Sequence, residues 1–240
     1  MSASLPVFNR GAVRPMECLR GGWDLIKDQY WLFMGMTFLA LFIGSAVPMG
    51  ILLGPMMCGL YLTLLRRQRG EPVQFDMLFK GFDYFKDGLI AALIQVVPVL
   101  LILLPSYAIM FPLYFSAIRS SRRGAPPDMV PFFAAFSVVM LLIMFISLAE
   151  AVFFIFTYPL IVDRGLSGID AIKVSFRAAT ANLGGVLGLV LMMMALSFLG
   201  VLACYVGALF VLPLHYAAWS IAYRQAFAPA PQPPPPPAGF

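Results

Sequence analysis

One uncharged stretch limits the folds that are open to this chain. No charged side chain lies between Asp28 and Arg66, and most of the intervening residues are apolar. A continuous helix over residues 30–66 would be roughly 55 Å long, whereas the hydrocarbon core of a bilayer is about 30 Å thick. The run GSAVPMG at residues 44–50 places glycine and proline near the middle of the stretch, where they favour a turn. We therefore predict a hairpin of two membrane helices of about 17 residues each.

Further apolar stretches indicate a polytopic membrane protein. They cover residues 88–118, 129–162 and 183–223, and each exceeds the ~18 residues of a membrane helix. Only 11% of the residues are charged, against about 25% in soluble domains. The predicted fold class is all-α, with one membrane domain over residues 14–225. We expect a flexible leader over residues 1–13 and a solvated, proline-rich tail over residues 226–240.

An amphipathic segment precedes each of three predicted pairs of membrane helices. In each segment apolar residues recur at spacings of three and four, with charged residues between them. We expect these segments to lie on the membrane surface, with Trp23, Tyr30 and Trp31 at headgroup depth. Packing of the first segment against loops of the bundle is the alternative. The apolar stripes are Met16, Leu19, Trp23, Ile26 and Tyr30; Leu78, Phe82, Phe85 and Leu89; and Ile169, Ile172, Phe176, Ala179 and Leu183.

The distribution of basic residues favours six membrane helices with both termini in the cytoplasm. In that topology 13 Lys and Arg side chains lie inside and 3 lie outside, in the loop 119–128. Basic loops are retained on the cytoplasmic side, which predicts a bacterial inner-membrane location and contact with anionic lipid headgroups. If residues 88–118 and 131–162 were hairpins as well, every basic loop would face inward, but each helix would have only about 15 residues. The net charge of +5 is explained by these flanking loops, and we do not expect nucleic acid as a partner.

Glu150 is the charged residue that most invites a functional interpretation. It is the only charged side chain between Asp128 and Asp163, within a predicted membrane helix. A carboxylate at the centre of the bilayer costs about 2.5–3.5 kcal/mol on insertion scales and marks a functional position by default. Proton coupling, cation coordination and a polar contact between helices are open alternatives. So is a protonated carboxyl hydrogen-bonded to a neighbouring helix, for which Gln95, Ser106, Ser197 and the tyrosines are candidate partners.

Prolines and glycines predict kinks and close helix contacts. Pro98, Pro105 and Pro112 recur every seven residues, so they lie near one face of their helix and remove backbone hydrogen bonds there. Such broken helices line transporter sites and also occur as simple kinks. Two groups of residues, Gly54-Pro55 with Gly59 and Gly184-Gly185 with Gly188, give small-xxx-small spacing and are expected to let helices approach closely.

The remaining polar residues form no signature of catalysis or of a cofactor. His215 is the only histidine and lies beside Tyr216, which predicts an interfacial position and not a metal site. The three cysteines are scattered and suggest neither a disulfide framework nor a metal ligand set. We find no nucleophile elbow, Walker A or HExxH pattern, so we expect neither an enzyme nor a cofactor.

Four runs of residues together resemble the YciC-like group of bacterial inner-membrane proteins, which is related in style to the membrane domain of some glycerophosphodiester phosphodiesterases. The runs are GGWDLIKDQYWLF from Gly21, GPMMCGLYLTLLRRQRGEPVQFDMLFKGFDYF from Gly54, YPLIVDRGLSGIDAIKVSFRAATAN from Tyr158 and LPLHYAAWSIAYRQAF from Leu212. The resemblance implies six helices, an inner-membrane location and cytoplasmic amphipathic segments. It implies no activity, substrate or catalytic residue.

Three hypotheses for function follow. The first is a non-enzymatic scaffold or accessory protein, whose surface helices and proline-rich tail would contact partners. The second is a small transporter or channel-like protein that uses Glu150. A lipid-modifying enzyme is the third, and it would need polar side chains that converge at headgroup depth.

Overall fold

The structure, a computed structural model, describes residues 6–46, 50–122, 128–202 and 206–227. Within these ranges every regular element is a helix, so the predicted all-α class is confirmed. The elements, with η for 3-10 helices, are α1 (Pro15–Ile26), η1 (Lys27–Gln29), α2 (Tyr30–Ala46), α3 (Leu53–Gln68), η3 (Phe75–Tyr84), α4 (Phe85–Arg122), α5 (Val130–Phe153), α6 (Thr157–Arg164), α7 (Gly168–Ala181), α8 (Leu183–Leu202) and α9 (Val206–Ala226).

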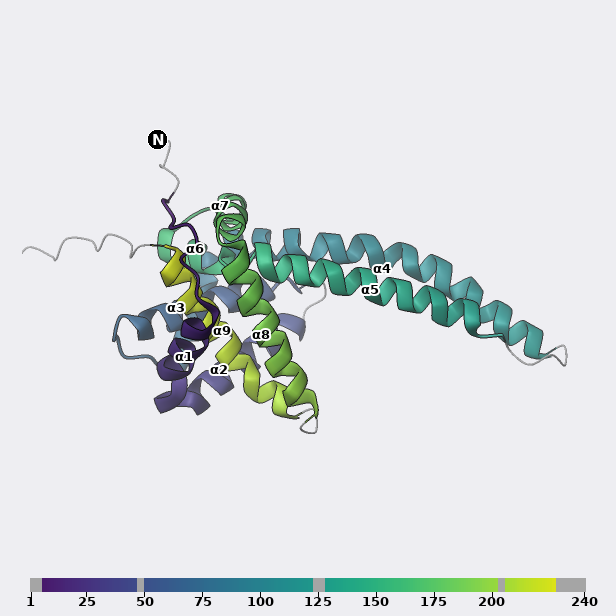
Figure 1. Ribbon diagram of the computed structural model, residues 1–240, viewed down its shortest axis with the longest axis horizontal. Coiled ribbons are helices and arrows are strands. Elements are labelled where there is room, and N and C mark those ends of the chain that lie inside the picture. The colour runs from purple at the N-terminus through teal and green to yellow at the C-terminus, as the bar shows by residue number, and fades with distance from the viewer. Residues whose placement is uncertain (1–5, 47–49, 123–127, 203–205, 228–240) are drawn as a thin grey trace, which may run out of the picture.

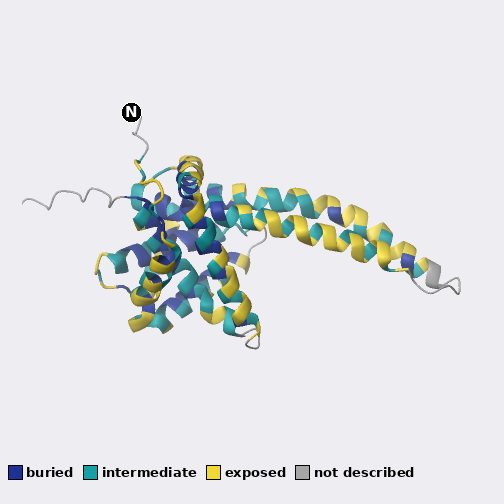
Figure 2. Ribbon diagram, in the orientation of Figure 1, coloured by how far each residue is buried: buried dark blue, intermediate teal, exposed yellow. Residues whose placement is uncertain are grey.

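A long hairpin projects from a compact body. Helices α4 and α5 run side by side away from the other helices (Figure 1). The 38 residues of α4 give a helix roughly 57 Å long, nearly twice the thickness of a hydrocarbon core. Buried residues concentrate in the body, whereas the outer part of the hairpin is mostly exposed or intermediate (Figure 2). The outer part of the hairpin therefore has few protein neighbours beyond its own two helices, whereas its inner part packs on α3, α7 and α8.

Four helical stretches of the described chain are long and apolar enough to cross a membrane. They are Pro15–Ala46, Phe75–Arg119, Val130–Arg164 and Leu183–Leu202. Two of the six predicted membrane helices, α3 and α9, are not among these four stretches. Helix α3 has 16 residues, fewer than the ~20 that span a bilayer without tilt. Helix α9 has 21 residues, but its second half carries histidine, tyrosine, tryptophan and serine, which lower its hydropathy.

The three amphipathic segments pack in the same manner. Helix α1 lies against α9, η3 lies against α3, and α7 lies against α6. Each segment therefore contacts the last helix of a predicted pair other than the pair that it precedes. In each segment a buried small residue (Gly22, Gly81 or Ser175) is followed by an exposed aromatic residue: Trp23, Phe82 and Phe176, respectively. Small residues let the backbones approach closely, and the aromatic rings are left on the outer surface.

Each predicted apolar stripe contains residues from both the buried face and the exposed face of its segment. In α1, Met16 and Trp23 are exposed, whereas Ile26 is buried. Cys18, Gly22 and Ile26, four residues apart, form the buried face of α1. The first segment thus packs on helix α9 of the bundle and leaves Met16 and Trp23 on its outer side, while its position at a membrane surface stays a prediction.

Glycines permit the closest of these contacts. A Cβ atom added to Gly59 of α3 would lie 1.8 Å from the carbonyl oxygen of Leu78 in η3. One added to Gly81 of η3 would lie 2.0 Å from the carbonyl oxygen of Pro55, and one added to Gly22 would lie 2.7 Å from the backbone nitrogen of Ala218. No side chain fits at such distances, so these helices pack backbone against backbone.

The segment before α1 is held against the body, although the sequence predicts a flexible leader there. Phe8 and Phe227 form an isolated antiparallel bridge, and the Asn9 N–H donates a hydrogen bond to the Ala226 carbonyl at 2.8 Å. The Asn182 side chain accepts a hydrogen bond from the Ala12 N–H and donates one to the Asn9 carbonyl. Ala226 and Phe227, the first residues of the predicted tail, are buried, and residues 228–240 lie outside the described chain.

Candidate functional site

A break in the third apolar stretch, residues 129–162, creates the polar centre of the body. Helix α5 ends at Phe153, and α6 begins at Thr157. The hydroxyl of Ser175 on α7 donates a hydrogen bond to the Phe153 carbonyl at 2.8 Å and accepts one from the Phe156 N–H at 3.1 Å. One serine side chain therefore satisfies backbone groups that the break releases from the helical pattern.

Glu150 lies one turn before this break. Its Oε1 atom is buried and has no hydrogen-bond partner among the described residues, and the same is true of Nε2 of Gln95 on α4. Gln95 forms a side-chain contact with the Tyr158 hydroxyl, and the Glu150 carboxyl lies close enough to act electrostatically on that hydroxyl. The structure thus brings Glu150 to a cluster of polar groups from three helices.

Three tyrosines, from α3, α6 and α9, meet beside these groups. The rings of Tyr61 and Tyr158 stack with centroids 6.4 Å apart and planes inclined by 10°. The rings of Tyr61 and Tyr216 meet edge to face at 6.1 Å. Tyr61 and Tyr158 are buried, and Tyr216 is partly buried. The sequence analysis did not single out this cluster, because the three residues are far apart in the chain.

The helix-kink prolines lie within one continuous helix. Pro98, Pro105 and Pro112 are all interior to α4. Each proline lacks an N–H, so the carbonyl four residues before it loses its helical partner. Pro105 and Pro112 are exposed on the hairpin, and Pro98 is partly buried nearer the body.

The four packing glycines predicted from the sequence have different surroundings. A Cβ atom on Gly54 would lie 2.0 Å from the carbonyl oxygen of Gly88, which is as close as the contact at Gly59. At Gly188 the nearest atom would be Pro15 Cγ at 3.1 Å, and at Gly184 the space is open. The closest approach of α8 to another backbone occurs instead at Gly185, where a Cβ would lie 2.1 Å from the Val13 carbonyl oxygen.

A buried carboxylate links three segments at the base of the body, which is the end where helices α3, α6 and α9 terminate. The side chain of Asp163 at the end of α6 is only 6% exposed. It pairs with the guanidinium of Arg69 and with that of Arg164 at 3.4 Å, and it accepts a hydrogen bond from the Tyr223 hydroxyl at 2.8 Å. This cluster joins the α3–η3 connection, α6 and α9. The sequence places Asp163 and Arg69 94 residues apart, so spacing alone gave no signal of the contact.

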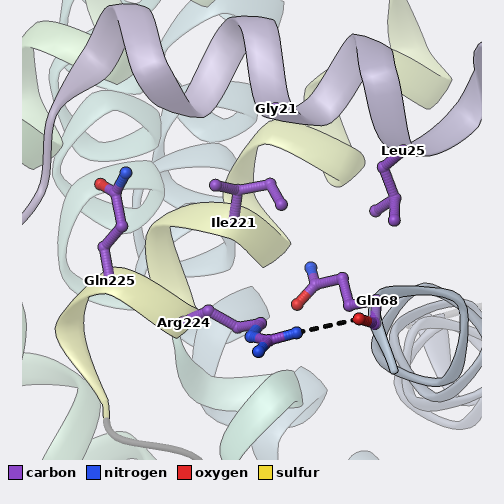
Figure 3. A pocket seen from close by; sticks show the side chains of 6 residues that line it. All are labelled: Gly21, Leu25, Gln68, Ile221, Arg224 and Gln225. Atoms are coloured by element: carbon purple, nitrogen blue, oxygen red, sulfur yellow. Dashed lines mark hydrogen bonds between the residues drawn. The ribbon is translucent and has the colours of Figure 1, made fainter. Parts of the chain in front are cut away.

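A pocket of about 360 Å³ lies at the same base, between α1, α9 and the end of α3 (Figure 3). Arg224 extends across it, and its Nη1 donates a hydrogen bond to the backbone carbonyl of Gln68 at 3.1 Å. The pocket is lined by Gly21, Leu25, Gln68, Ile221, Arg224 and Gln225. Glu150 is not among these residues.

His215 has an aromatic neighbour, and the thiol of Cys18 donates a hydrogen bond to Oε1 of Gln225 at 3.2 Å. The His215 ring lies 4.3 Å from that of Trp219, in an edge-to-face contact. Cys18 and Cys58 are buried and free, and Cys204 lies outside the described residues. Within the described chain no group of three or more His, Cys, Asp or Glu residues could hold a metal ion.

Comparisons with protein-family models, with curated proteins and with solved structures found no match to this chain.

Proposed function

We propose that this chain is a non-enzymatic scaffold protein of the bacterial inner membrane, with six membrane helices arranged as three hairpins. In this proposal the termini and the segments α1, η3 and α7 lie on the cytoplasmic side. The resemblance to the YciC-like group supports the same location and adds no activity. The proline-rich tail is proposed as a second contact for a protein partner.

The outer surface of the amphipathic segments supports an interfacial position. Trp23, Tyr30, Trp31 and Phe210 form a continuous series of ring contacts with centroids 5.7–6.0 Å apart. Trp23 is 49% exposed and Trp31 is 73% exposed. Tryptophan and tyrosine favour the headgroup region, because they combine an apolar ring with a polar atom. This belt would fix the depth of the body in a membrane.

The α4–α5 hairpin carries the scaffold proposal. Its helices expose large apolar side chains along the part that leaves the body, and Tyr107 near the middle of α4 is among the most exposed. The described residues provide no hydrogen-bond partner for the Tyr107 hydroxyl. A hydroxyl that faces hydrocarbon without a partner is unfavourable by roughly 1–3 kcal/mol on protein scales. A transmembrane helix of another protein, with a polar atom opposite Tyr107, would provide that partner and cover the exposed face.

Photo-crosslinking in intact membranes tests this proposal. A photoreactive amino acid would replace Leu104 or Phe145 on the hairpin, and Phe198 or Leu199 on α8 would serve as equally exposed comparison positions. We expect protein adducts of one defined mass from the hairpin positions and lipid adducts from α8. Tyr107→Phe, which keeps the ring and removes the hydroxyl, should reduce the hairpin adduct. Lipid adducts alone at every hairpin position would refute the scaffold proposal.

A small transporter is the second candidate, and the unpartnered Glu150 oxygen favours it. Coupled transport through this group would need a carboxyl that gains and loses a proton near neutral pH. Difference infrared spectroscopy of reconstituted protein against Glu150→Gln would identify the carboxyl band. A band that titrates between pH 5 and 9, together with proton flux that the variant lacks, would favour transport. A carboxyl that stays protonated throughout would remove the main support for this candidate.

A further inference from the structure

We propose that the pocket between α1, α9 and the end of α3 binds the phosphate of a membrane phospholipid headgroup. This site goes beyond a general attraction of basic loops to anionic lipid, because it names one cavity and one guanidinium. It also stands apart from the scaffold proposal, which rests on the α4–α5 hairpin.

Arg224 is the group that would hold the phosphate. Its guanidinium crosses the pocket and uses one N–H on the Gln68 carbonyl, which fixes its direction (Figure 3). Arg224 forms no ion pair with any carboxylate in the described part of the chain. The planar guanidinium has five N–H donors and matches the oxygens of a phosphate in a bidentate geometry. Its remaining donors are therefore available to an anion in the pocket.

Basic residues at the ends of the other helices provide an internal comparison. Arg66 near the end of α3 lies 11 residues after Pro55, as Arg224 lies 11 residues after Pro213. Arg66 pairs with Glu71 at 3.8 Å, and Arg164 at the end of α6 pairs with Asp163 at 3.4 Å. The chain supplies a carboxylate at those two helix ends. At the Arg224 end it supplies a pocket.

The walls of the pocket suit a group at the boundary between water and lipid. Gly21, Leu25 and Ile221 form an apolar side, while Arg224 lies on the polar side. Gly21 and Leu25 lie two residues before and after the exposed Trp23, on the opposite face of α1, so the pocket and the aromatic belt share this interfacial helix. Its volume of about 360 Å³ falls within the range of small-ligand sites, about 300–1,000 Å³. Phospholipid phosphates occupy this depth of a bilayer, which favours a lipid over a free anion.

Gln225 also lines the pocket, but its amide is engaged elsewhere. Its Oε1 accepts a hydrogen bond from the Arg14 N–H at 2.8 Å, and its Nε2 donates one to Glu17 at 3.4 Å. These contacts attach the start of α1 to the end of α9. They keep the two walls of the pocket at a fixed separation and leave phosphate recognition to Arg224.

Native mass spectrometry of the full chain in detergent micelles, titrated with phosphatidylglycerol, tests the site. The variant Arg224→Gln removes the cation. Arg177→Gln is the matched control, since Arg177 is an exposed cation on α7 that does not line the pocket. Gly21→Leu fills the pocket and keeps every charge, and its Cβ would meet Ile221 at an ordinary 3.4 Å. Diacylglycerol with the same acyl chains is the probe that lacks phosphate.

We expect Arg224→Gln to weaken binding of phosphatidylglycerol about tenfold, as the loss of one charge-assisted hydrogen-bonded pair does. Gly21→Leu should weaken it similarly, Arg177→Gln should leave it within about twofold, and diacylglycerol should not bind. Equal losses in Arg224→Gln and Arg177→Gln would overturn the proposal, because they would indicate surface charge alone. Displacement of the lipid by an equal concentration of inorganic phosphate would assign the pocket to free phosphate and would also overturn it. If Arg224→Gln fails to fold, Gly21→Leu and Arg224→Lys decide the question, with binding expected only in the lysine variant.

Discussion

The contact between α3 and η3 gives the sharpest test of how the body is held together. In the variant Gly59→Ala the new Cβ would lie 1.8 Å from the Leu78 carbonyl oxygen, whereas real Cβ contacts essentially never fall below 3.0 Å. The two elements must therefore separate by at least 1.2 Å, the difference between these distances. The atom that is struck belongs to backbone and cannot rotate away. Overpacking of this kind costs about 3 kcal/mol, the upper part of the usual range.

Helix propensity acts in the opposite direction and sets the net effect. Replacing glycine by alanine inside a helix stabilises it by up to about 1 kcal/mol. We therefore expect Gly59→Ala to lower the free energy of unfolding by about 2 kcal/mol. Gly184→Ala is the matched control, because the space around Gly184 is open. Its free energy of unfolding should stay the same or rise by about 0.5 kcal/mol, since this residue lies in the first turn of its helix.

Equilibrium unfolding in mixed micelles, followed by tryptophan fluorescence as the fraction of denaturing detergent rises, measures both variants. The difference between Gly59→Ala and Gly184→Ala should be about 2–2.5 kcal/mol. If the two variants unfold together, or if Gly59→Ala matches the unsubstituted protein, the backbone contact between α3 and η3 does not limit stability. The argument from close packing would then be wrong.

Further predictions concern the polar groups of the body and the base. Ser175→Ala should lower the free energy of unfolding by about 2 kcal/mol, because two buried backbone groups at the α5–α6 break lose their partner; Thr180→Ala, at an exposed position on the same helix, should cost under about 0.5 kcal/mol in the same unfolding assay. Asp163→Asn should cost about 2 kcal/mol, because the guanidinium groups of Arg69 and Arg164 lose a buried carboxylate, while half of Arg69 remains screened by water. High salt should shrink the share of the Asp163→Asn effect that comes from the 46% exposed Arg69, and should change the share of the less exposed Arg164 little. Proton flux into vesicles should be the same for the unsubstituted protein and for Glu150→Gln under the scaffold proposal, and a flux that only the variant lacks would contradict that proposal.

Composition and spacing predicted the class of fold because these features are local. A segment without charge over some 35 residues has no stable alternative to a helical path through lipid, whatever its neighbours are. Helix α2 likewise ends at Ala46, within the Gly-Ser-Ala-Val-Pro-Met-Gly run of residues 44–50, and α3 begins at Leu53. The amphipathic segments were found from periodicity, but the second of them is a 3-10 helix, which periodicity alone did not distinguish from an α-helix.

The polar clusters could not be predicted in this way, since their members come from distant parts of the chain. Asp163 and Tyr223 are 60 residues apart, and Ser175 reaches a helix break 19–22 residues earlier. Glu150 was found because a charge within an apolar run is visible locally. Gln95 and the tyrosines were among several candidate partners of Glu150 in the sequence, and only the packing of α4, α5 and α6 selects Gln95 and Tyr158 from them.

The pattern of residues along the chain was enough to predict that it is helical, that its longest helices are apolar enough to cross a membrane, and that three amphipathic segments accompany them. These properties follow from the cost of placing charges and unpaired backbone groups in hydrocarbon, which acts on each segment separately. Tertiary structure decided which face of each segment turns inward, where α5 breaks, and why Arg224 faces a pocket while Arg66 and Arg164 face carboxylates. Those outcomes depend on backbone approaches of a few ångströms between segments far apart in sequence, and no local pattern of residues records them.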